Sequence, residues 1–260
     1  MRKSALFLTG LFVLLCLPGI CKDKNLDNIQ MIFVKGGSFY MGCDDPQYHD
    51  VKYANERPLH RVHISSYYIA KYEVTNGMWR AVMGIYPPAY NGVDYANKAC
   101  DDCPVVKVSW DDAQEFIRRL NEKTGKKYRL PTETEWEYAA RGGNYASNSK
   151  YPGSNNINEV AWWGKHNGAT HPVGTKKPNE LSIYDLAGNV SEWCQDWYGE
   201  DYYSGTIDAN DPKGPATGTQ RVVRGGSFFT DDEVSRSVYR SFLPQDTRQW
   251  DLGFRLAMDY

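Results

Sequence analysis

The sequence lacks the features of several large classes of protein. Its 30 lysines and arginines against 32 aspartates and glutamates give a formal charge of −2, so we expect no nucleic-acid partner, which would need a clearly basic face. The five histidines and six cysteines form no cluster with zinc spacing. No glycine-rich loop leads into a helix as phosphate-binding loops do. Charged residues are 24% and hydrophobic residues 41%, which excludes a disordered tail and a polytopic membrane protein.

The N-terminal apolar run is too short to span a bilayer comfortably. A basic Met1-Arg2-Lys3 precedes an apolar stretch over 5–17, and Pro18-Gly19 ends it. This order is typical of a secretory signal. We therefore expect a signal peptide at residues 1–21 and a polar linker at residues 22–30.

A second interpretation of this segment is a lipoprotein with Cys21 acylated at the new N-terminus. The residue before such a cysteine is usually small, and Ile20 is not. A third interpretation is a buried N-terminal helix. The first two predict an exported protein, periplasmic or at the cell surface or outside the cell, with a membrane attachment only if Cys21 is lipidated.

The remaining cysteines suit an oxidising compartment. They allow two disulfides with three connectivities, among Cys43, Cys100, Cys103 and Cys194. The Cys100-x-x-Cys103 pair has the spacing of a redox motif, but no strand-then-helix pattern surrounds it. A local structural disulfide or two free thiols are both consistent with that loop.

Aromatic residues and glycine are abundant. The chain holds 8 Trp, 19 Tyr and 9 Phe, which is 14% of its residues, together with 23 Gly. Tyr and Trp bury large areas while keeping a polar group. This composition favours an irregular, turn-rich fold over a helical bundle, and no region of the 260 residues indicates a second domain.

Periodicity and capping residues predict a few regular elements. Strands are expected at 31–41 with a turn at Gly36-Gly37, at 61–74 and at 105–108. Three helices are expected, one from Thr75 to Met83, one begun by Ser109 and stopped by Gly125, and one begun by Thr132 and ended by Gly142-Gly143. Beyond residue 144 we expect only short strands and long loops.

Two sites invite a metal hypothesis. His60 and His63 are three residues apart on an expected strand, which places their rings on opposite faces and disfavours a shared ligand. The loop from Asp185 to Glu192 offers two carboxylates around Gly188, an arrangement that suits Ca²⁺ or an ordinary hydrogen-bonded turn. Ser227 has no histidine near it in sequence, so a hydrolase triad is unsupported.

Eight stretches in order match the motifs of one family. They are residues 36–42, 72–76, 104–110, 129–143, 171–174, 188–193, 224–228 and 252–255. On these motifs the chain resembles the formylglycine-generating enzyme family, also called the sulfatase-modifying factor domain, over residues 31–260. The resemblance implies a single α+β domain related to C-type lectins, with little regular secondary structure, many long loops and stabilising Ca²⁺.

The resemblance also implies a calcium site on the loop already noted. Asp185 and Glu192 would supply side-chain oxygens, and Gly188 and Val190 would supply carbonyl oxygens. The family's other calcium loop would lie near residues 161–171. That stretch lacks a convincing carboxylate, so this second site is not expected here.

The sequence departs from the family at its active site. Members hold Cu(I) between two cysteines shortly after the Gly-Gly-Ser motif and use O₂ to oxidise a substrate cysteine to formylglycine. Counting from Ser227, the matching positions are Thr230 and Ser235. A neutral hydroxyl is a poor ligand for a soft cation such as Cu(I), so we expect a degenerate site without copper.

These features predict an exported, calcium-stabilised, non-catalytic binding or scaffold domain. Its long loops at 44–58, 86–104 and 198–219 would receive a protein, peptide or glycan ligand. The alternative is a divergent oxidoreductase of the same family acting on a protein or peptide, for which the acidic run at 231–233 offers candidates. A sulfatase activator would need its thiolate from Cys43 or Cys194.

Overall fold

The computed structural model describes residues 26, 29–48, 50–85, 100–164 and 168–260. The predicted signal peptide at 1–21, with Cys21, lies outside the described residues. So do most of the predicted linker and residues 86–99 of one predicted binding loop. Within the described ranges, no helix combines the length and the apolar character needed to cross a membrane.

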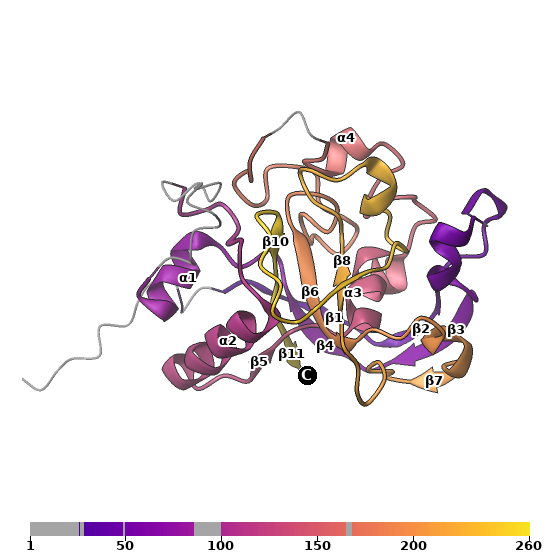
Figure 1. Cartoon of the computed structure of the whole chain (residues 1–260), viewed down its shortest axis with the longest axis horizontal. Helices are drawn as coiled ribbons and strands as arrows, with labels where there is room; N and C mark the ends of the chain where they lie inside the picture. Colours follow the sequence, from indigo (N-terminus) through magenta and orange to yellow (C-terminus); the bar gives the residue numbers. More distant parts are fainter. Residues whose placement is uncertain (1–25, 27–28, 49, 86–99, 165–167) are drawn as a thin grey trace, which may run out of the picture.

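Strands from distant parts of the chain form three small sheets (Figure 1). The first has the order β1-β4-β11-β5 and is antiparallel, with β1 Met31–Val34, β4 Tyr67–Ala70, β11 Ala257–Asp259 and β5 Tyr128–Arg129. The second has the order β10-β6-β8-β9, with β10 Leu252–Gly253, β6 Ser191–Trp197, β8 Arg221–Arg224 and β9 Ser241–Leu243. The third joins β2 Gly37–Met41, β3 His60–Ile64 and β7 Ala209–Asn210.

The helices begin where the sequence places their caps. Four α-helices are described, namely α1 Asn76–Met83, α2 Trp110–Thr124, α3 Glu133–Ala140 and α4 Ile157–Val160. Thr75 caps α1, and capping boxes of Ser109 with Asp112 and of Thr132 with Glu135 open α2 and α3. Short 3₁₀ turns lie at Pro46–Tyr48, Val51–Glu56, Gly143–Tyr145, Tyr202–Gly205 and Asp232–Ser235. The α+β fold class is therefore confirmed.

Two strand predictions were wrong. The stretch 61–74 is not one strand, because the chain turns at Ser65-Ser66 between β3 and β4, and Ser66 Oγ accepts a hydrogen bond from Gly36 N (3.0 Å). Residues 105–108 form no strand, because Lys107 adopts a left-handed φ of 63° that interrupts the extended backbone. The 105–108 segment is instead held in place by a hydrogen bond that Val105 N donates to Val74 O (2.8 Å).

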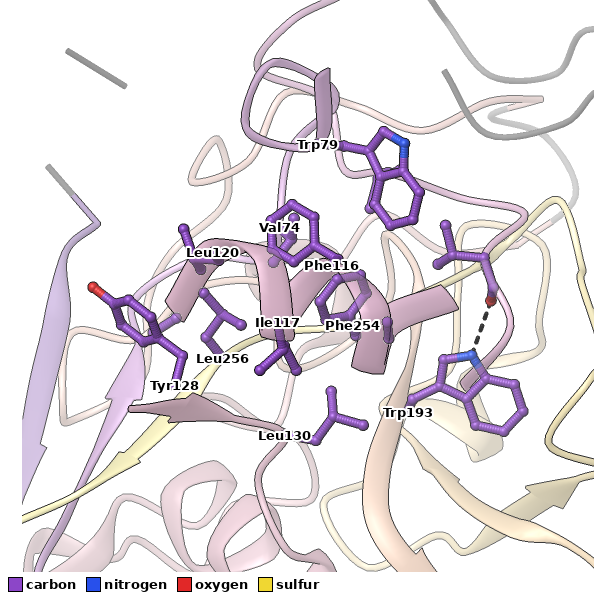
Figure 2. Packing of buried hydrophobic residues seen from close by; sticks show 14 of the residues in the cluster. Val74, Trp79, Phe116, Ile117, Leu120, Tyr128, Leu130, Trp193, Phe254 and Leu256 are labelled. Carbon is purple, nitrogen blue, oxygen red and sulfur yellow. Dashed lines mark hydrogen bonds between the residues drawn. The ribbon is translucent and has the colours of Figure 1, made fainter. Parts of the chain in front are cut away.

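One hydrophobic core lies under α2, as Figure 2 shows. The Phe116 ring stacks on Trp79 with centroids 5.4 Å apart and meets Phe254 edge-on at 5.4 Å. Trp193 Nε1 donates to Val108 O (3.0 Å), so its polar group is satisfied while the ring is buried. The apolar face of α2 thereby packs on the chain's C-terminal segment.

A second core surrounds α3, all of whose residues are buried, including three glutamates. Burying a carboxylate is costly unless it is paired. Arg240 donates to both oxygens of Glu133 (2.7 and 2.8 Å), and Arg224 donates to Glu137 (2.5 Å). Arg224 ends β8, where the Gly225-Gly226-Ser227 motif begins, and Arg240 immediately precedes β9, so these pairs attach α3 to both strands.

Candidate functional site

The turn after β8 brings Thr230 and Ser235 together. Gly225 and Gly226 have φ values of 93° and 67°, in the region that favours glycine. A Cβ on Gly226 would lie 2.7 Å from Ser235 Oγ and 2.9 Å from Thr230 Oγ1. Two side chains five positions apart therefore face the same glycine, at the place where the family resemblance puts a pair of cysteines.

The hydroxyls at this turn differ in their hydrogen bonding. Thr230 Oγ1 accepts from Ser227 N (2.8 Å), and Ser227 Oγ donates to Asp251 Oδ2 (2.7 Å). Ser235 is fully buried, and its Oγ has no hydrogen-bond partner among the described residues. A buried polar atom without a partner is uncommon and marks a place where a group is missing or strain is stored.

A cavity of about 240 Å³ lies beside this turn. Its lining includes Thr230, Ser191, Ser241 and Asp251, with Val223 among the apolar walls. Burial raises the pKa of the Asp251 carboxyl, and the hydrogen bond from Ser227 opposes that rise. The cavity can therefore accept hydrogen bonds from a small polar group, but it presents hydroxyls and a carboxyl rather than thiols.

The two free cysteines of the described chain lie elsewhere. Cys43 is partly exposed and Cys194 is fully buried, and neither is among the described residues that line this cavity. Burial raises the pKa of the Cys194 thiol well above its usual value and also raises that of Cys43. Both environments disfavour the thiolate that a copper site requires.

The acidic residues at 231–233 mostly form hydrogen bonds to side chains of neighbouring loops. Asp232 accepts hydrogen bonds from Tyr151 OH (2.7 Å) and Lys150 Nζ (3.1 Å). Glu233 accepts one from Tyr53 OH. Asp231 occupies the cap position of the 3₁₀ turn without a side-chain cap bond. These contacts give the run a structural role.

The predicted calcium loop contains a buried carboxylate oxygen that the described chain leaves unpartnered. Both oxygens of Glu192 are bound by Arg255 (2.6 and 2.6 Å), and Trp136 Nε1 adds a further bond (2.8 Å). Asp185 Oδ2 accepts from Gly174 N (2.7 Å), whereas Asp185 Oδ1 has no partner among the described groups. In the described part of the chain, no group of three or more His, Cys, Asp or Glu is arranged as a metal site.

Sequence reasoning missed Glu73 as a member of this cluster. Glu73 is buried and accepts from Asn189 Nδ2 (2.6 Å) and Val190 N (3.1 Å), across more than a hundred residues of chain. Glu73 belongs to the 72–76 stretch that matches the family, but no neighbouring residue in the sequence indicates that it contacts the 185–192 loop. Tertiary structure alone brings Glu73 to Asp185 and Glu192.

The cluster holds more buried carboxyl groups than basic groups. Its carboxylates are Glu73, Asp185 and Glu192, and one guanidinium, Arg255, faces them. Burial raises the pKa of Asp185 to about 6, and it raises that of Glu73 with added repulsion from the other two acids. Asp185 Oδ1 is the oxygen of this cluster that the described chain leaves open, and a carboxylate oxygen is a ligand that Ca²⁺ accepts.

The structure shows where the two histidines lie and whether Cys100 and Cys103 are bonded. His60 is buried, with Nδ1 against Pro58 O (2.8 Å), whereas His63 lies on the opposite face beside Ser38 Oγ (2.7 Å). Cys100 and Cys103 form a disulfide, which selects one of the two alternatives for that loop. The two histidines therefore do not form a shared site.

Comparison with known proteins places these motifs in a family. A model of the sulfatase-modifying factor enzyme 1-like domain matches residues 19–260. The formylglycine-generating enzyme of Thermomonospora curvata is 30% identical over 292 aligned positions, covering 88% of this chain and 93% of that protein. The chaperone protein LppX of Paenibacillus barcinonensis is 31% identical over 247 positions, covering 75% and 81%.

Solved structures agree with this result. The variable protein 1 of Treponema denticola superimposes with a TM-score of 0.76 and 32% identity, covering 88% of this chain and 95% of that one.

Proposed function

Because the chain belongs to the sulfatase-modifying factor enzyme 1-like domain family, we propose that it is an exported, calcium-stabilised binding or scaffold domain without copper oxidase activity. The observation that carries this proposal is the pair of hydroxyls at Gly226. Thr230 and Ser235 converge where the family resemblance places two copper-binding cysteines. This convergence supports a site that keeps the turn but carries hydroxyls in place of thiols.

The chemistry of these hydroxyls supports the proposed absence of copper. Cu(I) is bound by soft thiolate or thioether ligands, and a hydroxyl oxygen is hard. Thr230 Oγ1 already accepts a hydrogen bond from Ser227 N, and Ser235 Oγ is fully buried. With the Cu(I) ligands absent, the O₂-dependent oxidation of a substrate cysteine has no centre on which to occur.

One relative and the loops of this chain support a binding role. A relative named as a chaperone protein is consistent with a role in binding other proteins. The predicted binding segments at 44–58 and 198–219 contain little regular structure beyond short 3₁₀ turns and β7. Such loops on a rigid scaffold commonly carry recognition.

Calcium is proposed as the stabilising ion at the Asp185 loop. The three buried acids Glu73, Asp185 and Glu192 face one guanidinium, that of Arg255, and Asp185 Oδ1 has no partner in the described chain. A hard divalent cation with oxygen ligands would stabilise the ionised form of these acids. Removing the ion is then expected to destabilise the fold, including the Gly225-Gly226 turn, because Gly188 N donates to Gly225 O (2.9 Å) and Phe228 N donates to Asn189 O (2.9 Å).

The proposal is tested by Cu(I) titration of the purified protein against a competing chelator. We expect no tight copper binding by the parent protein and tight binding by the Thr230→Cys/Ser235→Cys variant, because that variant restores two soft ligands at converging positions. The single Thr230→Cys variant is the matched control and should bind copper much more weakly. Stoichiometric tight copper in the parent would overturn the proposal.

The formylglycine-generating enzyme among the relatives favours a second candidate, a divergent oxidoreductase acting on a protein or peptide. Oxygen consumption with cysteine-containing peptides separates it from the first. Turnover that survives copper chelation and is lost on Asp251→Asn would support this second candidate. No oxygen consumption with any peptide supports the binding role.

A further inference from the structure

A second cavity, of about 380 Å³, lies where three segments far apart in the sequence meet. Its described lining comes from residues 43–47, from residues 141–155 after α3, and from residues 236–238. It shares no described lining residue with the cavity beside Gly226. Cys43 and Val238 are the only apolar side chains in that described lining, so the cavity suits a small polar ligand.

Arg141 presents part of its guanidinium to this cavity. Its Nε donates to Glu137 Oε1 (2.9 Å), and its Nη2 donates to Gly42 O (2.7 Å). Gly42 N also donates to Glu137 Oε1 (2.9 Å), so the guanidinium is held in place beside Cys43. Arg141 Nη1 makes no hydrogen bond within the described chain, and the side chain is 26% exposed. Two charged N–H donors are therefore available to a ligand in a fixed position.

Ser237 lines the cavity with a hydroxyl that lacks a partner. The residue is only 3% exposed, and its Oγ makes no hydrogen bond to any described group. Its backbone is held on both sides, because Ser237 N donates to Lys150 O (3.3 Å) and Ser237 O accepts from Arg224 Nη2 (3.2 Å). A buried hydroxyl without a partner is uncommon. At the wall of a cavity, an oxygen of a bound ligand can be that partner.

Two exposed asparagines add further amide groups to the walls. The Asn148 amide makes no hydrogen bond within the described chain. Asn155 Oδ1 accepts from Lys150 N (2.8 Å), which leaves both N–H groups of that amide for a ligand. The cavity therefore offers more hydrogen-bond donors than its own walls use.

The charged side chains of the described lining favour a ligand with one negative charge. Arg141, Lys150 and Arg236 are its bases, and Asp45 is its one acid. The acids that pair with these bases are not members of the described lining; they are Glu137, Asp232 and Glu56. Burial raises the pKa of the Cys43 thiol, so the thiol stays neutral and does not repel an anion. Asp45 adds a like charge, which disfavours a doubly charged phosphate.

We propose that this cavity binds the carboxylate of a small polar organic acid. Arg141 and Ser237 are the residues that would bind the carboxylate oxygens, since hydrogen bonds from a guanidinium to a carboxylate are among the strongest in proteins. The amides of Asn148 and Asn155 would bind hydroxyl or amino groups on the same ligand. This inference goes beyond the proposed function and holds whether or not the Gly226 turn binds copper.

The test is calorimetry of the full protein with lactate, glutamate and glucuronate, and with inorganic phosphate and sulfate. We expect a carboxylate to bind more tightly than either inorganic anion. Arg141→Lys keeps a positive charge beside Glu137 but loses the Nη1 donors, and it should weaken the affinity about tenfold. Arg119→Lys is the matched control, at an exposed arginine on α2 that pairs with Glu115, and it should have no effect.

A second variant tests the unpartnered hydroxyl. Ser237→Ala should weaken carboxylate binding about three- to tenfold, because the ligand loses one hydrogen bond. The same variant should unfold thermally as the parent does, since the hydroxyl makes no hydrogen bond in the described chain. A merely structural role would instead change the stability and leave the affinity unaltered.

Cys43 provides an independent measure of occupancy. Its thiol is partly exposed and lines the cavity, whereas Cys194 is fully buried. A bound carboxylate should slow the alkylation of Cys43 by iodoacetamide at mildly alkaline pH. Mass spectrometry of the peptide that contains Cys43 measures this rate, and Ser237→Ala should reduce the protection in proportion to its loss of affinity.

Three outcomes would overturn the inference. They are no binding of any of the three carboxylates, binding of phosphate or sulfate as tight as that of the best carboxylate, and binding that Ser237→Ala leaves unchanged. If Arg141→Lys fails to fold, Ser237→Ala and the protection of Cys43 still decide. A failed carboxylate test with no copper binding leaves the proposed function standing, whereas tight copper would overturn that function and leave this cavity to be judged by its own variants.

Discussion

Arg255 and Glu192 form a two-point ion pair in which neither residue is exposed to solvent. Arg255 Nε donates to Glu192 Oε2 and Arg255 Nη2 to Glu192 Oε1, both at 2.6 Å. The same guanidinium donates to the backbone oxygens of Ala70 (3.1 Å) and Tyr184 (3.0 Å). One side chain after β10 therefore joins the start of β6, the end of β4 and the calcium loop.

We predict that Arg255→Met destabilises the protein by about 3–5 kcal/mol, because it leaves buried carboxylates without their counter-charge. Urea unfolding at neutral pH measures the loss. Arg118→Met removes an exposed arginine that pairs with Glu115 and Glu122 on α2, and it should have no measurable effect. An Arg255→Met protein as stable as the Arg118→Met protein would contradict the role assigned to this pair.

Calcium is predicted to raise the melting temperature. An ion present at about one hundred times its dissociation constant adds about 2.7 kcal/mol, which corresponds to about 5 °C or more for a chain of this size. Thermal unfolding with EDTA and then with excess Ca²⁺ measures this shift. Asp185→Asn should remove most of it, whereas Asp208→Asn, at an exposed acid that pairs with Arg61 on β3, should leave it intact. Equal responses of the two variants would place the ion elsewhere.

A methyl group at Gly226 is predicted to be more harmful than one at Gly84. Both glycines have positive φ, so alanine at either position costs about 1 kcal/mol or more in backbone strain. No described atom lies within 4 Å of a Cβ at Gly84, but a Cβ at Gly226 would collide with Ser235 Oγ and Thr230 Oγ1. We expect Gly226→Ala to exceed Gly84→Ala by about 1–3 kcal/mol in denaturant unfolding. Equal losses would mean that the two hydroxyls do not crowd that glycine.

The start of α2 is predicted to weaken in acid. Burial works to raise the pKa of Asp112, but hydrogen bonds from Arg248 and Ser109 outweigh it and hold the pKa below the ordinary 3.8. The stability from Asp112 is therefore present above that pH and is lost as the pH falls through the lower, folded-state value. Asp112→Asn should cost about 1 kcal/mol at pH 7 and progressively less below pH 3.8. Asp111→Asn, beside it but outside the capping box, should change less at pH 7. A constant difference across this range would contradict the assignment.

Local interactions determine where the main helices begin. Thr75, Ser109 and Thr132 cap helices where their side chains and the following residues predicted, because a cap needs only neighbours three positions away. The ends of the strands were harder to predict from the sequence. The break at Ser65-Ser66 and the left-handed Lys107 depend on partners far along the chain, so a continuous strand was predicted where tertiary contacts impose turns.

The sequence alone determined which atoms are present at the two candidate sites. It placed hydroxyls at Thr230 and Ser235 instead of thiols, and it placed carboxylates at Asp185 and Glu192. Tertiary structure decided what surrounds them. It brings both hydroxyls to Gly226 and adds Glu73 and Arg255 to the acidic loop, and it assembles a cavity around Cys43 and Ser237 that no motif marks. The physical reason is that buried charges and cavity walls are completed by residues far apart in sequence, whose proximity depends on the packing of the whole chain.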